Sequence, residues 1–331
     1  FCFYYYIHPK TSLLYRILKL AARLAIRIYC RKLVINNRSW LQQKGPLLLA
    51  CNHPNSFLDS VIIDTIFNAP VWSLARGDAF KKPFYARLLR KLYILPVYRT
   101  SEGVENLSEN YKTFNDCIRL FRQNGIITIF SEGKCINEWH LRPLKKGTAR
   151  LAVQAWQEAI PLTVLPVAIN YSSFTRFGKN IFIRFGTPIT AASIDLQAAD
   201  GLRNAAFNKL LQEELQQGVF EIAKDDQATQ QQLLTVPVPA WKKILLFFPA
   251  LLGWLLHAPL YYPVKSFVWK RTRDNDHYDS VMVGMLMILY PLYIILVVVV
   301  LALLTNFIWS LGTFLLLPFT AWCVVQWKTQ H

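Results

Sequence analysis

Two short polar stretches contain the side chains best suited to chemistry. Residues 52–59 include His53 and Asp59, and residues 130–134 include Glu132, Gly133 and Lys134. Each stretch follows an apolar run that is typical of a buried strand. An imidazole beside a carboxylate is suited to removing a proton, and a charged turn with a glycine is suited to binding an anion. Together they indicate acyl transfer to an alcohol that carries a phosphate.

His53 is the candidate base. An imidazole, whose ordinary pKa is near ~6.5, can take a proton from a hydroxyl at cytosolic pH, and Asp59 can hold its tautomer and stabilise the imidazolium. The structural alternative is that His53 caps a turn and Asp59 caps the helix after it. The other histidines lie in no comparable setting.

Basic residues that can bind phosphate follow the second stretch. Residues 134–150 contain five basic residues and only one acidic residue, Glu138. The basic residues are Lys134, Arg142, Lys145, Lys146 and Arg150. Lys134 and Arg142 are nearest the strand end and are the better candidates, whereas the last three are typical of a solvated helix face. A second basic block, from Arg76 to Arg99, can line the same cleft or contact lipid headgroups.

The middle of the chain alternates between strand and helix patterns. We expect strands at 47–50, 71–75, 94–97, 126–130, 162–168 and 181–185, and helices at 59–67, 79–91, 104–122 and 147–158. This alternation predicts an α/β fold with a mostly parallel sheet flanked by helices. In such sheets the ligand site lies outside the carboxyl ends of the strands, where both polar stretches fall.

The N-terminal segment predicts a basic amphipathic helix. Residues 1–40 contain eight basic residues and no acid, and the cations recur at three- and four-residue steps. An aromatic cluster at residues 1–6 precedes them. We expect this helix to lie in the interface of an anionic membrane; the alternative is an ordinary helix packed on the domain.

The C-terminal segment predicts a transmembrane helical hairpin over 281–325. Residues 281–304 and 307–325 contain no charge, and each is near the ~20 residues that a bilayer requires. Basic residues flank the hairpin on both sides, so we expect an integral membrane protein whose bulk lies at the cytoplasmic face of the membrane. Prolines interrupt a third apolar stretch at 244–262, for which we expect a half-buried or re-entrant segment.

These patterns divide the chain into an interface helix (1–40), an acyl-transfer domain (41–235) and a membrane region (236–331). The hydrophobic fraction of 53 % and the net charge of +17 fit a protein that contacts anionic lipids. The basic residues interleave with apolar segments, which disfavours nucleic-acid binding. The six cysteines show no metal or disulfide spacing, so we expect no metal and no cofactor, and Cys51 is expected to be a buried apolar residue.

The chain resembles the glycerolipid acyltransferases, which include 1-acylglycerol-3-phosphate and glycerol-3-phosphate acyltransferases. Four blocks in order carry the resemblance, at residues 52–59, 76–99, 130–133 and 164–169. It implies that His53 is the base and Asp59 its partner, and that Glu132 and Gly133 belong to the acceptor site. It further implies that Arg99 binds the acceptor phosphate and that the donor is acyl-CoA or acyl carrier protein, next to the block around Pro166.

Two departures from the family pattern leave the acceptor open. Five residues separate His53 from Asp59, where the family usually has four, and Lys134-Cys135 stands where the family usually has Thr-Arg. In both departures the chain resembles the branch of the family that acylates glycerol-3-phosphate or dihydroxyacetone phosphate. Lys134 or Arg142 can replace the missing arginine. The alternatives are a lysophospholipid or amino-acid-lipid acyltransferase, and a non-catalytic protein that binds anionic membranes.

Overall fold

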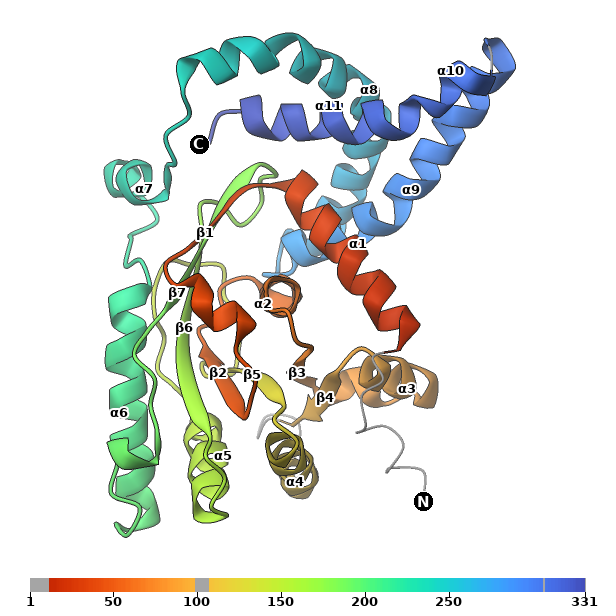
Figure 1. The fold of residues 1–331 in the computed structure, drawn as a ribbon. Coiled ribbons are helices and arrows are strands. Elements are labelled where there is room, and N and C mark those ends of the chain that lie inside the picture. The colour runs from red at the N-terminus through yellow and green to blue at the C-terminus, as the bar shows by residue number, and fades with distance from the viewer. Residues whose placement is uncertain (1–11, 99–106, 306, 331) are drawn as a thin grey trace.

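The computed structural model describes residues 12–98, 107–305 and 307–330, which form one mixed sheet with helices on both faces and a C-terminal group of apolar helices (Figure 1). The strand order is β1-β7-β6-β2-β5-β3-β4. Every neighbouring pair is parallel except β6 and β7, which are antiparallel. The strands are β1 (Cys30–Ile35), β2 (Leu47–Cys51), β3 (Val71–Arg76), β4 (Ile94–Val97), β5 (Ile126–Phe130), β6 (Thr163–Tyr171) and β7 (Lys179–Phe185).

Central strand β2 is buried on both faces, which explains its uninterrupted apolar sequence. Leu48 and Ala50 belong to one core cluster, whereas Leu47, Leu49 and Cys51 belong to the other. The helices before the C-terminal group are α1 (Leu13–Tyr29), α2 (Ser56–Ile66), α3 (Pro83–Lys91), α4 (Leu107–Arg122), α5 (Lys146–Gln157), α6 (Asp200–Gly218) and α7 (Gln227–Leu234). The first cluster includes residues of α4, α5 and α6, and the second includes residues of α1 and α2.

The predicted α/β class with a mostly parallel sheet is confirmed. The strands expected at 94–97 and 126–130 have those limits, and the other four differ at their ends. The region 1–40, expected as an interface helix, is not helical over its whole described part. Helix α1 ends at Tyr29, and Cys30–Ile35 forms an edge strand paired with β7. Helices α6 and α7 were also not expected. The domain limits themselves stay a prediction.

Helix α1 turns two of its cations toward the domain. Lys19 pairs with Asp64 at 3.2 Å, and Arg23 donates to the carbonyl oxygens of Thr65 and Phe67 at 2.7 and 3.1 Å. Burial lowers the pKa of Lys19. The opposite face is apolar and exposed, and it consists of Leu13, Leu14, Ile17, Leu20 and Leu24. The aromatic cluster at residues 1–6 lies outside the described residues.

The C-terminal group consists of α8 (Ala240–Thr272), α9 (Tyr278–Leu304), α10 (Phe307–Leu311) and α11 (Thr313–Trp327). By length and composition, α8 and α9 can each cross a membrane, and only 17 % and 11 % of their most apolar windows are buried. After α9 the chain turns back through α10, and α11 runs along one half of α8 (Figure 1). The two long helices therefore expose apolar surface that a soluble protein would cover.

Two details of the membrane region differ from expectation. The stretch 244–262 is part of continuous helix α8, which contains Pro249, Pro259 and Pro263 and bends in Figure 1. Proline removes a backbone donor and bends a helix, which fits the bend of α8. The second arm of the expected hairpin is divided at Gly312, which leaves α11 with 15 residues.

Candidate active site

The polar stretches lie together because β2 and β5 end level with each other. Cys51 is opposite Phe130 in the parallel register, and the Ser131 N–H donates to the Cys51 carbonyl oxygen at 2.8 Å. Asn52 then pairs with Ile169 of β6 through its side-chain amide, at 3.0 and 2.7 Å. The chain therefore leaves the sheet at His53 with a fixed direction.

His53 and Asp59 form the expected pair. His53 Nδ1 is 2.8 Å from Asp59 Oδ2, and the Asp59 side chain is fully buried whereas that of His53 is 15 % exposed. A carboxylate at Nδ1 favours the tautomer with the proton on that nitrogen, which leaves Nε2 as the acceptor. The ring also stacks on Phe130, with centroids 4.0 Å apart.

Asp59 accepts hydrogen bonds from two further donors. The Tyr171 hydroxyl donates to Oδ1 at 2.7 Å, and the Asn55 N–H donates to Oδ2 at 2.8 Å. Burial, followed by the charge of Asp59, raises the pKa of Tyr171 well above its ordinary value, so the phenol keeps its proton. Sequence reasoning missed Tyr171, although it ends a strand on the same edge of the sheet.

Glu132 faces the protein. Its side chain is 2 % exposed, and its two oxygens accept from the His53 N–H at 2.9 Å, the Arg142 N–H at 3.0 Å and Arg142 Nη2 at 2.8 Å. The carboxylate thus joins the turn that contains His53 to the loop that follows β5. Its predicted contact with the acceptor stays a prediction, since its oxygens are used by these backbone and guanidinium donors.

The predicted anion-binding residues differ in exposure. Arg142 is 16 % exposed; besides Glu132 it contacts Glu138 at 3.5 Å and donates to the Lys134 carbonyl oxygen. The Lys134 side chain is exposed. Gly133 has φ +71°, a left-handed conformation that favours glycine, and a Cβ there would lie 3.1 Å from Lys145 Cγ. Arg99 lies outside the described residues.

The cysteines near the site are poor nucleophiles. Burial raises the pKa of the Cys51 thiol well above its ordinary value, and burial raises that of Cys135 to about 11. A thiol that keeps its proton is unreactive near neutral pH. Within the described ranges, no group of three or more His, Cys, Asp or Glu residues is placed to hold a metal ion.

One wall of the site comes from the segment that links α8 to α9, which sequence reasoning missed. His277 Nδ1 lies 2.6 Å from Ser56 Oγ, and Asp276 accepts from the Asn137 N–H at 2.9 Å. The Leu58 N–H donates to Ser280 Oγ at 2.9 Å. These contacts join the linking segment and the start of α9 to the first polar stretch and to the loop that follows the second.

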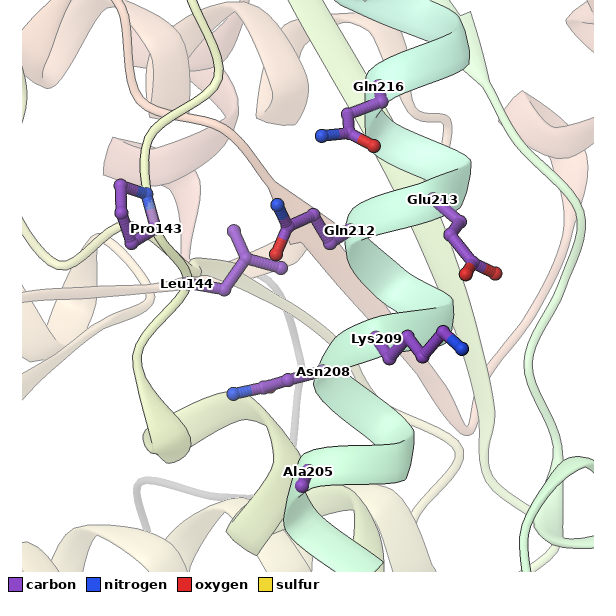
Figure 2. Close-up of a pocket in the computed structure, with 8 residues that line it drawn as sticks. All are labelled: Pro143, Leu144, Ala205, Asn208, Lys209, Gln212, Glu213 and Gln216. Atoms are coloured by element: carbon purple, nitrogen blue, oxygen red, sulfur yellow. The ribbon is translucent and has the colours of Figure 1, made fainter.

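A groove of about 470 Å³ lies beside α6 and is separate from the His53–Asp59 pair (Figure 2). Pro143 and Leu144 form one side, and Asn208 and Gln212 of α6 lie opposite them. Lys209 and Glu213 point away from Leu144 in this view. Neither His53 nor Glu132 lines the groove, and we assign no role to it.

Residues 32–170 match the model of the Acyltransferase family, from β1 to the end of β6. The match includes both polar stretches. Among solved structures, the 1-acyl-sn-glycerophosphate (LPA) acyltransferase PlsC from Thermotoga maritima is similar with a TM-score of 0.42 and 18 % identity, over 61 % of this chain and 78 % of that chain. No curated protein sequence matches the chain.

Residues 32–170 therefore form a domain of the acyltransferase family, and the protein is an acyltransferase enzyme. The resemblance noted in its four sequence blocks is confirmed at the level of the family. The non-catalytic alternative is therefore set aside.

Proposed function

We propose that the protein moves a fatty acyl group from acyl-CoA or acyl carrier protein to a hydroxyl of a glycerophosphate, either glycerol-3-phosphate or 1-acylglycerol-3-phosphate. The observation that carries the proposal is the 2.8 Å contact between His53 Nδ1 and a fully buried Asp59. The carboxylate fixes the ring, and Nε2 has no hydrogen-bond partner within the part of the chain that the structure describes.

In this mechanism His53 Nε2 removes the proton from the acceptor hydroxyl, and the oxygen attacks the thioester carbonyl. The tetrahedral intermediate places negative charge on the former carbonyl oxygen, which backbone N–H groups stabilise. Collapse breaks the carbon–sulfur bond, and the imidazolium returns the proton to the leaving thiolate. Asp59 stabilises the imidazolium throughout. The products are an ester and a free thiol, and no covalent enzyme intermediate forms.

The acceptor phosphate is proposed to lie over the loop after β5. Lys134 is exposed there, and its ammonium group makes no hydrogen bond or ion pair with the described part of the chain. Arg142 is already shared between Glu132 and Glu138, so it contributes less net positive charge. We therefore give Lys134 the main phosphate contact, Arg142 the task of shaping the loop, and Arg99 the secondary role that the family pattern implies.

We propose that the enzyme works at the cytoplasmic face of an anionic membrane. Helix α1 runs between the C-terminal helices and α3 in Figure 1. It has an exposed apolar face, and α3 exposes Phe84 and Tyr85. An apolar face of this kind is stable within the headgroup boundary. Helices α8 and α9 are proposed to enter the bilayer, with Lys270, Arg271 and Arg273 at their cytoplasmic connection.

An acceptor panel tests the substrate class. The purified full chain in anionic vesicles is supplied with labelled acyl-CoA or acyl carrier protein and with glycerol-3-phosphate, 1-acylglycerol-3-phosphate, a neutral lysophospholipid or an amino-acid lipid. We expect product with a glycerophosphate, and a rise in its KM of about tenfold in Lys134→Ala, the effect of losing one charge-assisted hydrogen bond. Exclusive use of the neutral lysophospholipid or of the amino-acid lipid would replace the glycerophosphate proposal.

A further inference from the structure

The first turn of α9 buries a charged network against the turn that contains His53. Asp279 Oδ2 accepts from Asn55 Nδ2 at 2.8 Å, Oδ1 accepts from the Tyr29 hydroxyl at 2.9 Å, and the carboxylate pairs with Lys179. The side chains of Asp279 and Lys179 are fully buried. The network thus joins the end of α1, the turn after β2, the start of β7 and the start of α9.

A buried ion pair of this kind is poorly explained by stability alone. Desolvation of two charges can exceed their attraction, and well-packed apolar residues often stabilise a fold as well. The network does fix one arrangement of the four segments, because any other arrangement leaves a charge buried without its partner. The network lies beside the turn that contains His53, which indicates that the fixed arrangement serves the His53–Asp59 pair.

Asn55 connects the network to the catalytic pair. Its backbone N–H donates to Asp59 Oδ2, the same oxygen that contacts His53 Nδ1. Its side chain is held by Asp279 through Nδ2, and its Oδ1 has no partner in the described structure. The next residue, Ser56, has φ +51°, a strained conformation for a residue other than glycine. The turn therefore depends on outside contacts to keep its shape.

Helix α9 also supplies the cap that α2 lacks. Asn55 is the N-cap residue of α2, yet its side chain makes no capping bond. The Leu58 N–H in the first turn donates instead to Ser280 Oγ, at 2.9 Å. The same hydroxyl donates to the Asn55 carbonyl oxygen at 3.2 Å. An asparagine at this position normally accepts from the first turn itself. Asp59 lies in that first turn.

We infer that Asp279 and Ser280 are positioning residues for the catalytic pair: the first turn of α9 caps α2 and holds Asn55, so that Asp59 stays on His53. The inference rests on the proposed function of His53 and Asp59. It makes the docking of the C-terminal helices and the assembly of the active site one event.

Two matched double variants isolate the bond between residue 279 and Asn55. Lys179→Met with Asp279→Asn removes both charges but keeps an amide that can bond to the Asn55 side chain, whose Oδ1 is free to accept. Lys179→Met with Asp279→Leu removes the charges and the bond while keeping a side chain that branches at Cγ. We expect the Asn variant to keep kcat within about threefold of wild type and the Leu variant to lose about tenfold or more, the effect of a lost hydrogen bond to a positioning group.

The expected loss appears in kcat, with little change in the acceptor KM and with similar melting temperatures for the two double variants. Ser280→Ala should behave like the Leu variant, and Asp274→Asn, an exposed carboxylate in the preceding segment, should behave like wild type. Equal kcat in the two double variants, or a loss that follows melting temperature, would overturn the inference. Wild type and His53→Ala are assayed in the same experiment. Equal product formation by these two enzymes would refute the proposed function of His53, which is a different outcome from failure of the positioning role of Asp279 and Ser280.

Discussion

At the scale of single residues, Asp59 is the most constrained group of the site. It is fully buried, and its two oxygens contact His53, Tyr171 and the Asn55 N–H. In the proposed mechanism this carboxylate stabilises the imidazolium that forms during transfer. The same donors keep the carboxylate in one place, which a general base requires of its partner.

Tyr171→Phe should lower kcat about tenfold with a small change in either KM. The substitution removes the hydroxyl that donates to Asp59 Oδ1 and leaves a buried carboxylate oxygen without that partner. Steady-state kinetics with both substrates varied give the split between kcat and KM. A wild-type kcat in Tyr171→Phe would show that Asp59 needs no support from β6.

Alkylation of the enzyme at pH 8 should leave most of its activity. Because the pKa of Cys135 is raised to about 11, roughly one thiol in a thousand is the reactive thiolate at that pH, and burial raises the pKa of Cys51 as well. The fraction of thiolate, and with it any inactivation, increases as pH rises toward the thiol pKa. Residual activity after iodoacetamide treatment measures this. Rapid inactivation that Cys51→Ser prevents would restore the case for a covalent cysteine intermediate.

At the scale of elements, the sequence predicted the contact between His53 and Asp59 but not the segments that surround it. The strands at 94–97 and 126–130 were predictable because short apolar runs between polar segments have few alternatives. Edge strand β1 was not predictable, since its basic residues continue the basic pattern of α1. His53 and Asp59 were found because they are close in sequence. Tyr171, Asn55 and Asp279 meet only in the folded chain.

Asp279 did carry a signal that sequence reasoning passed over. It stands two residues before the charge-free stretch 281–304, and an acid at the margin of an apolar segment is a reason to seek a buried partner. Its partner Lys179 opens strand β7, a hundred residues earlier in the chain. No periodicity links positions so far apart, so only the structure identifies the pair.

The apolar face of α1 should be in contact with lipid. A fluorescent probe on Leu20→Cys is expected to show blue-shifted emission and strong quenching by lipids with a brominated acyl chain, whereas the same probe on Lys224→Cys should show neither. Cys2→Ser serves as the background, because the five cysteines in the described part of the chain are buried. Equal quenching at both positions would place α1 away from the bilayer.

At the scale of the whole molecule, the apolar C-terminal helices and the α/β domain form one connected unit. Helix α11 packs along α8, α1 contacts α9, and the first turn of α9 reaches the catalytic turn. A substrate that resides in the membrane would therefore meet the site next to the helices that we propose enter the bilayer. This arrangement gives a physical reason for joining an acyltransferase domain to an apolar C-terminal region.

The direct test of the account is product formation by wild type and His53→Ala in anionic vesicles, with acyl-CoA or acyl carrier protein and a glycerophosphate acceptor. Cys51→Ser serves as the matched control, since it changes the buried residue two positions earlier. We predict that wild type and Cys51→Ser form the acylated product at similar rates and that His53→Ala loses about 10²-fold or more, as expected for loss of a general base. A His53→Ala enzyme that works at the wild-type rate would contradict the account.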